Sequence, residues 1–229
     1  MYKLDSFYKA AKDLRYLLTR GYPLNSAIEL VGNHYQLSKD KRVILQRGVC
    51  SESKARERKN KKKGLFQLRG RPLGIDGHNI LITVESALKN KPLILSDDGF
   101  IKDISAVSKS YRPSHFTTDV LNLIFELLKH HPPVKMDWYL DAPLSKSGEL
   151  AELIRDFLKK YKFEGTAQAV PVPERYLTKY SGLVATSDSV LIDVCEEVID
   201  LAGEVIKSLP NLTLFILQNG ITQYLVDFE

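Results

Sequence analysis

The sequence predicts an α/β fold, with a mainly parallel sheet covered by helices on both faces and a small all-helical domain before it. From residue 65 onward, short apolar segments alternate with longer amphipathic ones, as strands and helices do in such a sheet. Before residue 51, the apolar residues recur with the period of helices. A basic segment separates the two patterns. We therefore expect a helical domain at 1–50, a basic linker at 51–64 and an α/β domain at 65–229.

The composition fits a soluble protein with a substantial core. Apolar residues make up 44% of the 229 residues, which excludes global disorder. Cys50 and Cys195 lie too far apart in sequence to suggest a disulfide framework or a zinc knuckle. No segment approaches the roughly 20 apolar residues that span a bilayer, and the N-terminus lacks the apolar stretch of a signal peptide. We expect a cytoplasmic protein that does not bind membranes.

The helical domain is predicted to contain three helices. The first begins after Asp5 or Ser6 and ends at Gly21-Tyr22-Pro23, where backbone constraints stop it. The second begins near Asn25, and the third follows Ser38, a good N-cap. The last two helices resemble a helix-turn-helix, although a helical cap that packs on a neighbouring domain explains the pattern equally well.

The basic segment at 51–63 holds seven Lys or Arg residues and two Glu, so its net charge of +5 equals that of the whole chain. Such a segment is either a solvated linker or an arm that follows the phosphates of a nucleic acid, and one segment can serve as both. The candidate phosphate-binding residues in it are Lys59, Lys61, Lys62 and Lys63.

The α/β region gives the following expected elements. Strands are predicted at 71–76, 134–143, 166–172, 182–188 and 211–218, and two apolar pieces flank Asp97-Asp98-Gly99 within 92–104. Helices are predicted at 79–90, 115–131, from 147 onward, and as one long helix at 189–209. Trp138 is expected in the core, and His78 on an exposed loop.

Three of these strands end in an aspartate: Asp76, Asp141 and Asp188. Because the carboxyl ends of parallel strands share one edge of a sheet, we expect these carboxylates to lie together, where they repel one another unless a cation binds between them. Oxygen ligands suit Mg²⁺ or Mn²⁺, and such an ion activates water for cleavage of a phosphodiester. The sequence therefore predicts a divalent-metal site at this edge, with these three aspartates as ligands and catalytic residues.

Each aspartate also has a structural explanation. Asp76 could form a turn with Gly77, Asp141 could belong to the turn before Pro143, and Asp188 is a good N-cap for the helix that follows. Two further acids are weaker candidates for the metal. Asp98 fits a hairpin turn, and Asp193 falls outside the apolar face of its predicted helix.

The motifs "IDGHN", "YLDAP" and "VATSDS", in this order on alternating strands and helices, resemble the PIN-like nucleases, including their NYN branch. The resemblance covers about residues 65–229. It implies a small Rossmann-like sheet with an acidic pocket at one edge and divalent-metal-dependent ribonuclease activity. The whole chain also resembles a largely archaeal family of unknown function, which joins a short helical N-terminal domain to a PIN-like one.

The resemblance implies roles for particular residues. Asp76 matches the first-strand acid, with Asn79 in its motif, and Asp188 matches the late acid that follows a strand. Asp141 matches the middle acid less closely, because many PIN proteins place theirs on a helix. Ser189 follows Asp188 where an acidic pair occurs in NYN proteins, which leaves open whether one ion, two ions or no catalytic ion binds.

Other residues are candidates for binding substrate. Asn79 could hold a phosphate through its amide, and Ser145, Lys146 and Ser147 open a helix whose N-terminus suits a phosphate, or form an ordinary capped loop. Tyr111-Arg112 and Arg175-Tyr176 are aromatic-basic pairs suited to stacking on unpaired bases.

The predicted function is a metal-dependent nuclease, with RNA favoured over DNA as substrate. The alternatives are a non-catalytic protein that binds RNA or DNA with the same fold, and a phosphohydrolase of small molecules. The closing segment 221–229 is apolar enough to pair with a sheet edge or with a second subunit in a homodimer.

Overall fold

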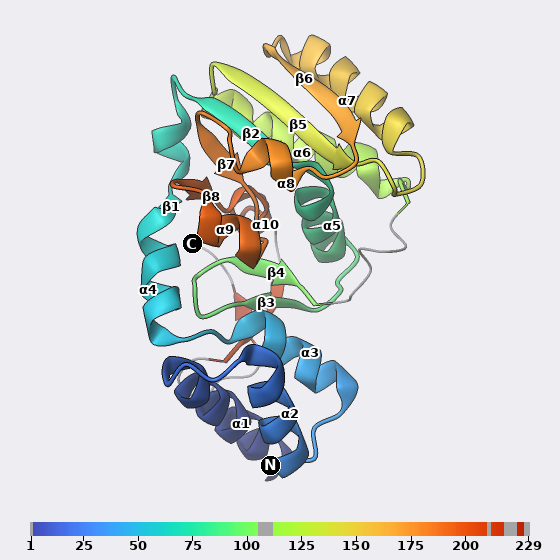
Figure 1. Ribbon diagram of the computed structural model, residues 1–229. Coiled ribbons are helices and arrows are strands. Elements are labelled where there is room, and N and C mark those ends of the chain that lie inside the picture. The colour runs from blue at the N-terminus through green and yellow to red at the C-terminus, as the bar shows by residue number, and fades with distance from the viewer. Residues whose placement is uncertain (1, 105–111, 210–211, 218–223, 227–229) are drawn as a thin grey trace. The chain divides into compact units, whose positions relative to one another are not determined.

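The computed structural model describes residues 2–104, 112–209, 212–217 and 224–226 (Figure 1). It divides the chain into two compact units, one made of 1–60, 92–105 and 210–229 and the other of 61–91 and 106–209. The units therefore do not follow the expected boundaries at 50 and 64. The first unit includes a hairpin from the middle of the chain and strands from its end. The order of elements along the sequence does not reveal this grouping. Tyr111 lies outside the described residues.

The first unit combines helices with a small sheet. Its elements are α1 (Tyr2–Thr19), α2 (Leu24–His34), α3 (Lys39–Gly48), most of α4 (Glu52–Lys61), β3 (Leu93–Leu95), β4 (Ile101–Asp103), β9 (Leu212–Ile216) and β10 (Tyr224–Val226). The three predicted helices are confirmed, and Ser38 caps α3 by accepting a hydrogen bond from the N–H of Lys41. Ile94 of β3 and Leu217 belong to the same buried cluster as Leu14 of α1 and Leu45 of α3, so helices and sheet share one core.

The sheet of this unit has the order β10-β9-β3-β4. Strands β3 and β4 form the predicted hairpin, whereas β9 pairs with β3 in parallel and β10 with β9 in the antiparallel sense. Part of the segment 221–229 thus pairs with a sheet edge, one of the two partners expected for it.

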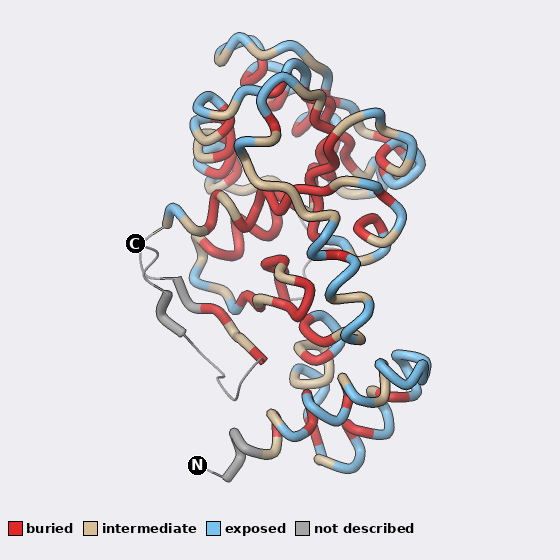
Figure 2. The backbone as a smooth tube through the Cα atoms, turned by 90° about the vertical axis from the view of Figure 1, so that its left-hand side faces the viewer, coloured by how far each residue is buried: buried red, intermediate tan, exposed pale blue. Residues whose placement is uncertain are grey.

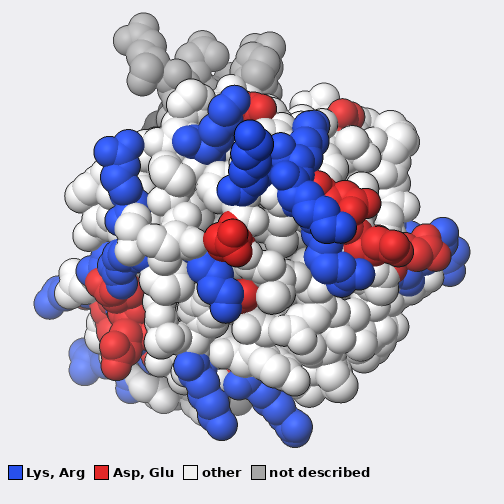
Figure 3. Space-filling view, turned by 90° about the horizontal axis from the view of Figure 1, so that it is seen from above, with Lys and Arg blue, Asp and Glu red and all other residues white. Residues whose placement is uncertain are grey.

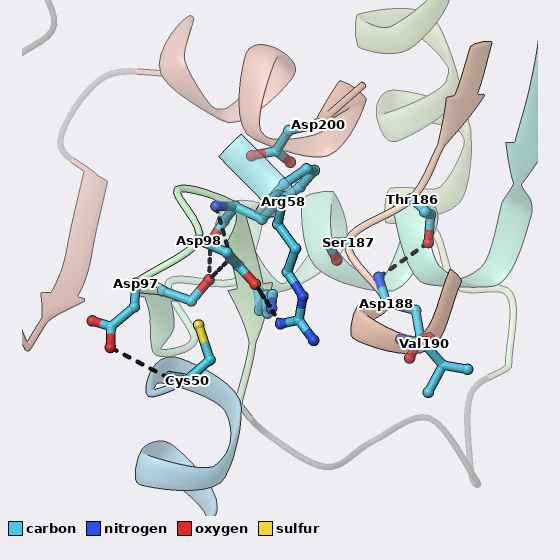
Figure 4. A network of polar contacts seen from close by, with 12 residues as sticks. Cys50, Arg58, Asp97, Asp98, Thr186, Ser187, Asp188, Val190 and Asp200 are labelled. Carbon is cyan, nitrogen blue, oxygen red and sulfur yellow. Dashed lines mark hydrogen bonds and ion pairs between the residues drawn. The ribbon is translucent and has the colours of Figure 1, made fainter. Parts of the chain in front are cut away.

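The turn of the β3–β4 hairpin carries two buried aspartates in a network of charges (Figure 4). Asp97 accepts two hydrogen bonds from the guanidinium of Arg15, at 2.7 and 2.8 Å, and one from the N–H of Cys50. Asp98 forms ion pairs with Arg58 at 2.9 Å and Lys102 at 2.8 Å. Burial opposes ionisation of Asp98, but these partners hold its pKa below the ordinary value. The network fixes the hairpin to α1, α3 and α4.

Most of the segment 51–64, which we expected to be a linker, has regular secondary structure. Residues Glu52–Lys61 form helix α4, and Lys62–Lys63 form strand β1. The helix has almost no apolar side, which is why periodicity did not reveal it. It is stabilised instead by specific contacts, such as the buried ion pair between Arg58 and Asp98.

The second unit contains a six-stranded, all-parallel sheet in the order β1-β8-β7-β2-β5-β6. Its strands are β1 (Lys62–Lys63), β2 (Pro72–Asp76), β5 (Lys135–Asp141), β6 (Gly165–Val170), β7 (Leu183–Ala185) and β8 (Val198–Ile199). Its helices are η1 (Leu65–Leu68), α5 (Gly77–Leu88), α6 (Phe116–His130), α7 (Ser147–Tyr161), α8 (Glu174–Leu177), α9 (Ser189–Val194) and α10 (Leu201–Lys207). The α/β prediction is therefore confirmed at this level.

Helices cover both faces of this sheet, as residues of β5 illustrate. Trp138 is fully buried, as expected, and its ring stacks parallel to that of Phe125 of α6 at 6.0 Å. The neighbouring Asp137 points to the opposite face, where its carboxylate accepts hydrogen bonds from Tyr180, just after α8, and from Thr166. Since successive side chains alternate along a strand, α6 and α8 lie on opposite faces (Figure 1).

The predicted long helix at 189–209 is wrong. The segment forms α9, strand β8 and α10 instead. Val198 and Ile199 add a buried strand that pairs with β7 on one side and β1 on the other. Asp200 then starts a new helix, because its carboxylate accepts the N–H of Gly203. The β-branched pair followed by a capping residue indicates this break.

Burial is concentrated in the strands and on the helix sides that face them (Figure 2). Among the described residues, no helix combines the length and apolar character that crossing a membrane requires.

The charge network of the first unit yields a stability prediction. Asp98→Ala removes the carboxylate on which Arg58 and Lys102 converge, so we expect the free energy of unfolding in urea to fall by about 3–5 kcal/mol. Asp156→Ala is the matched control, because Asp156 is 65% exposed and pairs with Lys159 only at the surface; a change of about 0.5 kcal/mol or less is expected there. Equal effects of the two substitutions would contradict the assignment.

Candidate active site

The sheet brings the three predicted strand ends to one edge. Strands β7, β2 and β5 are adjacent and parallel, with Ala185 opposite Ile75 and Asp76 opposite Tyr139. Asp76 and Asp141 are the last residues of their strands, and Asp188 follows β7 by three positions. Strand β2 is also where the chain order reverses, because β5 and β6 lie on one side of it and β7 and β8 on the other. Ligand sites of open parallel sheets form at this switch point.

Asp76 is a buried carboxylate with little compensation. Its side chain does not cap α5, so the turn role considered from the sequence is not the one it plays. The residue is 8% exposed, and Oδ2 accepts a 2.8 Å hydrogen bond from the hydroxyl of Thr186. Burial raises the pKa of Asp76 to about 7 against the opposing effect of that bond, and the charges of Asp188 and Asp141 raise it further. The carboxylates of Asp141 and Asp188 therefore act electrostatically on that of Asp76.

Asp188 has the structural role that the sequence suggested. Its Oδ1 caps α9 by accepting hydrogen bonds from the N–H groups of Val190 and Leu191, at 2.8 and 3.1 Å. Its own N–H donates to the Thr186 hydroxyl at 3.0 Å (Figure 4). The Thr186 hydroxyl therefore connects Asp76 and Asp188 directly. Thr186 was missed from the sequence, although a hydroxyl residue two positions before a strand-end aspartate is a usable signal.

Asp141 is paired with His78, which is buried rather than on the exposed loop we expected. His78 lies in the first turn of α5 and is 3% exposed. Its Nδ1 accepts the N–H of Asp141 at 2.9 Å and lies 3.2 Å from Oδ2 of the same residue. Because α5 starts immediately after β2, the "DGHN" motif turns His78 toward the end of β5. The hydrogen bond fixes the backbone at Asp141, whose carboxylate is partly exposed.

Asn79 is a positioning residue. Its side-chain oxygen accepts hydrogen bonds from both the N–H and the hydroxyl of Ser187, at 2.8 and 2.9 Å. It therefore holds the turn after β7 that carries Thr186 and Asp188. A further acid, Glu174 of α8, also raises the pKa of Asp76 and was not predicted.

The donor set suits a hard cation in part. Within the described residues, no group of three or more His, Cys, Asp and Glu side chains is arranged to hold a metal ion. One or two carboxylates are nevertheless the usual protein contribution to a Mg²⁺ ion, which keeps several of its waters. The buried Asp76 accepts its hydrogen bond from the hydroxyl of Thr186, and within the described part of the chain no cationic side chain pairs with it, so it fits such an ion.

The two weaker acidic candidates are engaged elsewhere. Asp98 is bound by Arg58 and Lys102 within the first compact unit. Asp193 lies in α9 with a partly exposed side chain, and its backbone carbonyl accepts a 2.7 Å hydrogen bond from Lys61.

Three of the four predicted phosphate-binding lysines make contacts within their own unit. Lys61 donates to the backbone carbonyls of Ile192 and Asp193 at the end of α9. Lys62 pairs with Asp200 at 3.1 Å, and Lys63 with Glu197 at 3.3 Å. Lys59 is exposed. The charges of Lys62 and Lys63 are thus paired with carboxylates, and a role of the segment in binding phosphates stays a prediction.

The turn before α7 is likewise bound to its surroundings. The Ser147 hydroxyl donates to the carbonyl of Ala142, and Lys146 pairs with Glu149, whereas Ser145 is exposed.

Basic side chains on the face seen in Figure 3 lie among acidic ones. No continuous basic surface covers this view.

The chain matches two families. Residues 65–204 match the family described as "Domain of unknown function (DUF5616)", and residues 6–61 match "Protein of unknown function (DUF434)". The chain is similar to the uncharacterised protein MJ0935 of Methanocaldococcus jannaschii, at 37% identity over 206 residues that cover 89% of this chain and 98% of the relative. No solved structure matches it. The resemblance to families of unknown function with an archaeal member is confirmed, whereas the PIN-like assignment stays a prediction.

The raised pKa of Asp76 predicts a pH dependence without divalent ions. Between its ordinary value of 3.8 and about 7, the folded protein keeps a proton on Asp76 that the unfolded chain releases. The free energy of unfolding therefore falls as pH rises through this range and levels off above it. At about 1.4 kcal/mol per pKa unit, the upper size of the effect is about 4 kcal/mol.

The measurement compares the wild type with Asp76→Asn in EDTA. Urea unfolding at intervals from pH 4 to 8 isolates the contribution of Asp76 as the difference between the two proteins. We expect Asp76→Asn to gain stability relative to the wild type as pH rises. A difference that stays constant with pH would show that Asp76 ionises normally.

Proposed function

Since the chain belongs to the family described as DUF5616, we propose its function from the site itself: a divalent-metal-dependent phosphodiesterase that cleaves RNA. The proposed site is PIN-like, at the carboxyl edge of a Rossmann-like sheet. A resident Mg²⁺ or Mn²⁺ would activate water and neutralise charge that develops on the phosphate.

The observation that carries the proposal is the placement of Asp76. A carboxylate is costly to bury unless it is paired, and Asp76 is buried next to like charges at the switch point of the sheet. A structural aspartate in this position would be expected to form an ion pair or to cap a helix. Asp76 does neither among the described residues, since it accepts a hydrogen bond from the Thr186 hydroxyl and its side chain does not cap α5. Strongly perturbed acids in such positions mark functional sites.

The residues at this edge of the sheet have different proposed roles. Asp76 and Asp141 would hold the ion, with Asp188 contributing to the negative field that attracts it. Thr186 orients the Asp76 carboxylate, and His78 holds the backbone at Asp141 by accepting its N–H. Asn79 holds the turn after β7 through Ser187.

One observation favours an alternative function, namely a non-catalytic protein that binds RNA or DNA. The oxygen of Asp188 that caps α9 is already engaged by two N–H groups, and no three acidic side chains within the described ranges are arranged around an ion. In that case the same edge of the sheet would bind nucleic acid without cleaving it.

The proposal is tested by cleavage of a pooled, end-labelled RNA in Mn²⁺ or in EDTA. Asp76→Asn should reduce the rate at least about 100-fold without unfolding the protein, since even outer-shell partners of a metal contribute about 10- to 100-fold. Asp156→Asn is the matched control, because this aspartate is 65% exposed, and it should cleave at the wild-type rate.

The outcomes separate the two functions. Products that require Mn²⁺ and disappear with Asp76→Asn support the nuclease. A shifted RNA band without products, unaffected by EDTA, supports the binding protein. Full activity of Asp76→Asn would remove Asp76 from the mechanism.

A further inference from the structure

An exposed tyrosine lies on the same face of the sheet as the candidate site. Tyr176 of α8 is 45% exposed, although its ring stacks on that of Tyr139 with centroids 5.1 Å apart and planes 20° apart. Tyr139 is buried in β5. One ring face of Tyr176 is therefore supported from below, while a large part of the ring remains open to solvent.

The supporting ring is directly connected to the site. Tyr139 is the register partner of Asp76, so the two side chains leave neighbouring strands on the same face of the sheet. Asp141, two positions after Tyr139, shares this face. From α8, Glu174 adds its charge to those that raise the pKa of Asp76. Tyr176, stacked on Tyr139, thus lies over the face of the sheet on which the side chains of Asp76 and Asp141 stand.

The support is rigid. Tyr180 packs edge-on against Tyr139 at 6.5 Å, and its hydroxyl donates a 3.0 Å hydrogen bond to the buried Asp137. Asp137 also pairs with Lys135. Gly74 of β2 leaves the space for this arrangement, since a Cβ there would come within 2.9 Å of the Tyr180 ring. A flat aromatic surface held in this way loses little entropy when a second ring stacks on it.

The charges around Tyr176 favour a phosphate-bearing ligand. Arg175 and Lys179 are exposed one position before and three positions after Tyr176, and Glu174, also exposed, precedes them. A single exposed aromatic residue is common on protein surfaces. The combination of an open ring, a buried ring beneath it and flanking cations is the pattern that binds single-stranded nucleic acid by base stacking.

We infer that Tyr176 stacks on an unpaired base of single-stranded RNA and thereby holds the adjoining phosphate near Asp76. The inference rests on the proposed function for the role of Asp76, but the stacking contact is a binding property that needs no cleavage. It makes Tyr176 a substrate-positioning residue and unpaired RNA the preferred substrate, because the bases of a duplex are already stacked.

The test measures binding by fluorescence anisotropy in EDTA, with a labelled 12-nucleotide oligouridine and a 12-unit abasic phosphodiester strand as probes. The wild type should bind the oligouridine about 5- to 100-fold more tightly than the abasic strand, the range expected for loss of one base stack. Tyr176→Ala should lose this preference, whereas Tyr176→Phe should retain it. An RNA duplex should compete poorly.

Phe66→Ala is the matched control, because Phe66 is an exposed aromatic residue, at 77%, in η1. It should keep the wild-type preference. The inference is overturned if Tyr176→Ala still prefers the oligouridine, if Phe66→Ala loses the preference equally, if the duplex competes as well as the single strand, or if the wild type binds no oligouridine. Circular dichroism verifies that the variants are folded.

Failure of this inference and of the proposed function are distinguishable. Binding of the two strands in EDTA tests the stacking role of Tyr176, and cleavage by the wild type in Mn²⁺ tests the nuclease. A wild type that cleaves RNA in Mn²⁺ but binds the oligouridine no more tightly than the abasic strand would overturn the role of Tyr176 alone. Retained stacking without any cleavage would overturn the nuclease and leave a single-strand-binding protein.

Discussion

The buried carboxylate of Asp76 is the constraint around which the second unit is arranged. Desolvation of a charge is costly, and the like charges nearby increase that cost. The elements around it serve to keep it in place: Thr186 donates to it, and the same hydroxyl accepts the N–H of Asp188. Asn79, three residues after Asp76, holds the turn that carries Thr186 and Asp188. A proton or a divalent ion is what makes this arrangement tolerable, and that is why the site is proposed to bind a metal.

The first unit shows how the same chain handles a buried aspartate that has a structural role. Asp98 is even less exposed than Asp76, yet two cationic side chains contact it and its pKa is lowered. The pKa of Asp76 is raised instead, because a hydroxyl is its hydrogen-bond partner and its charged neighbours are acids. Both carboxylates are buried, but only the charge of Asp98 is compensated by cationic side chains. This contrast within one protein is the strongest reason to regard Asp76 as functional.

The parts of the fold that depend on local pattern could be predicted from the sequence. Alternating apolar segments identified the strands that end at Asp76 and Asp141, and helical periodicity identified most helices. The failures have physical causes. Helix α4 lacks an apolar side and depends on contacts such as that of Arg58, and the stretch 189–209 has continuous helical periodicity interrupted by a strand only two residues long. The burial of His78 depends on where α5 begins relative to β5, which is a tertiary property.

The central claim is that a divalent cation replaces the proton on Asp76. The most direct measurement is calorimetric titration with Mn²⁺ at pH 7 in buffers of different ionisation enthalpy, which reports the protons released on binding. With a pKa of about 7, Asp76 should release about half a proton per ion bound in the wild type, and Asp76→Asn should bind weakly and release none. Absence of Mn²⁺ binding, or binding of equal strength and proton release in Asp76→Asn, would contradict the account.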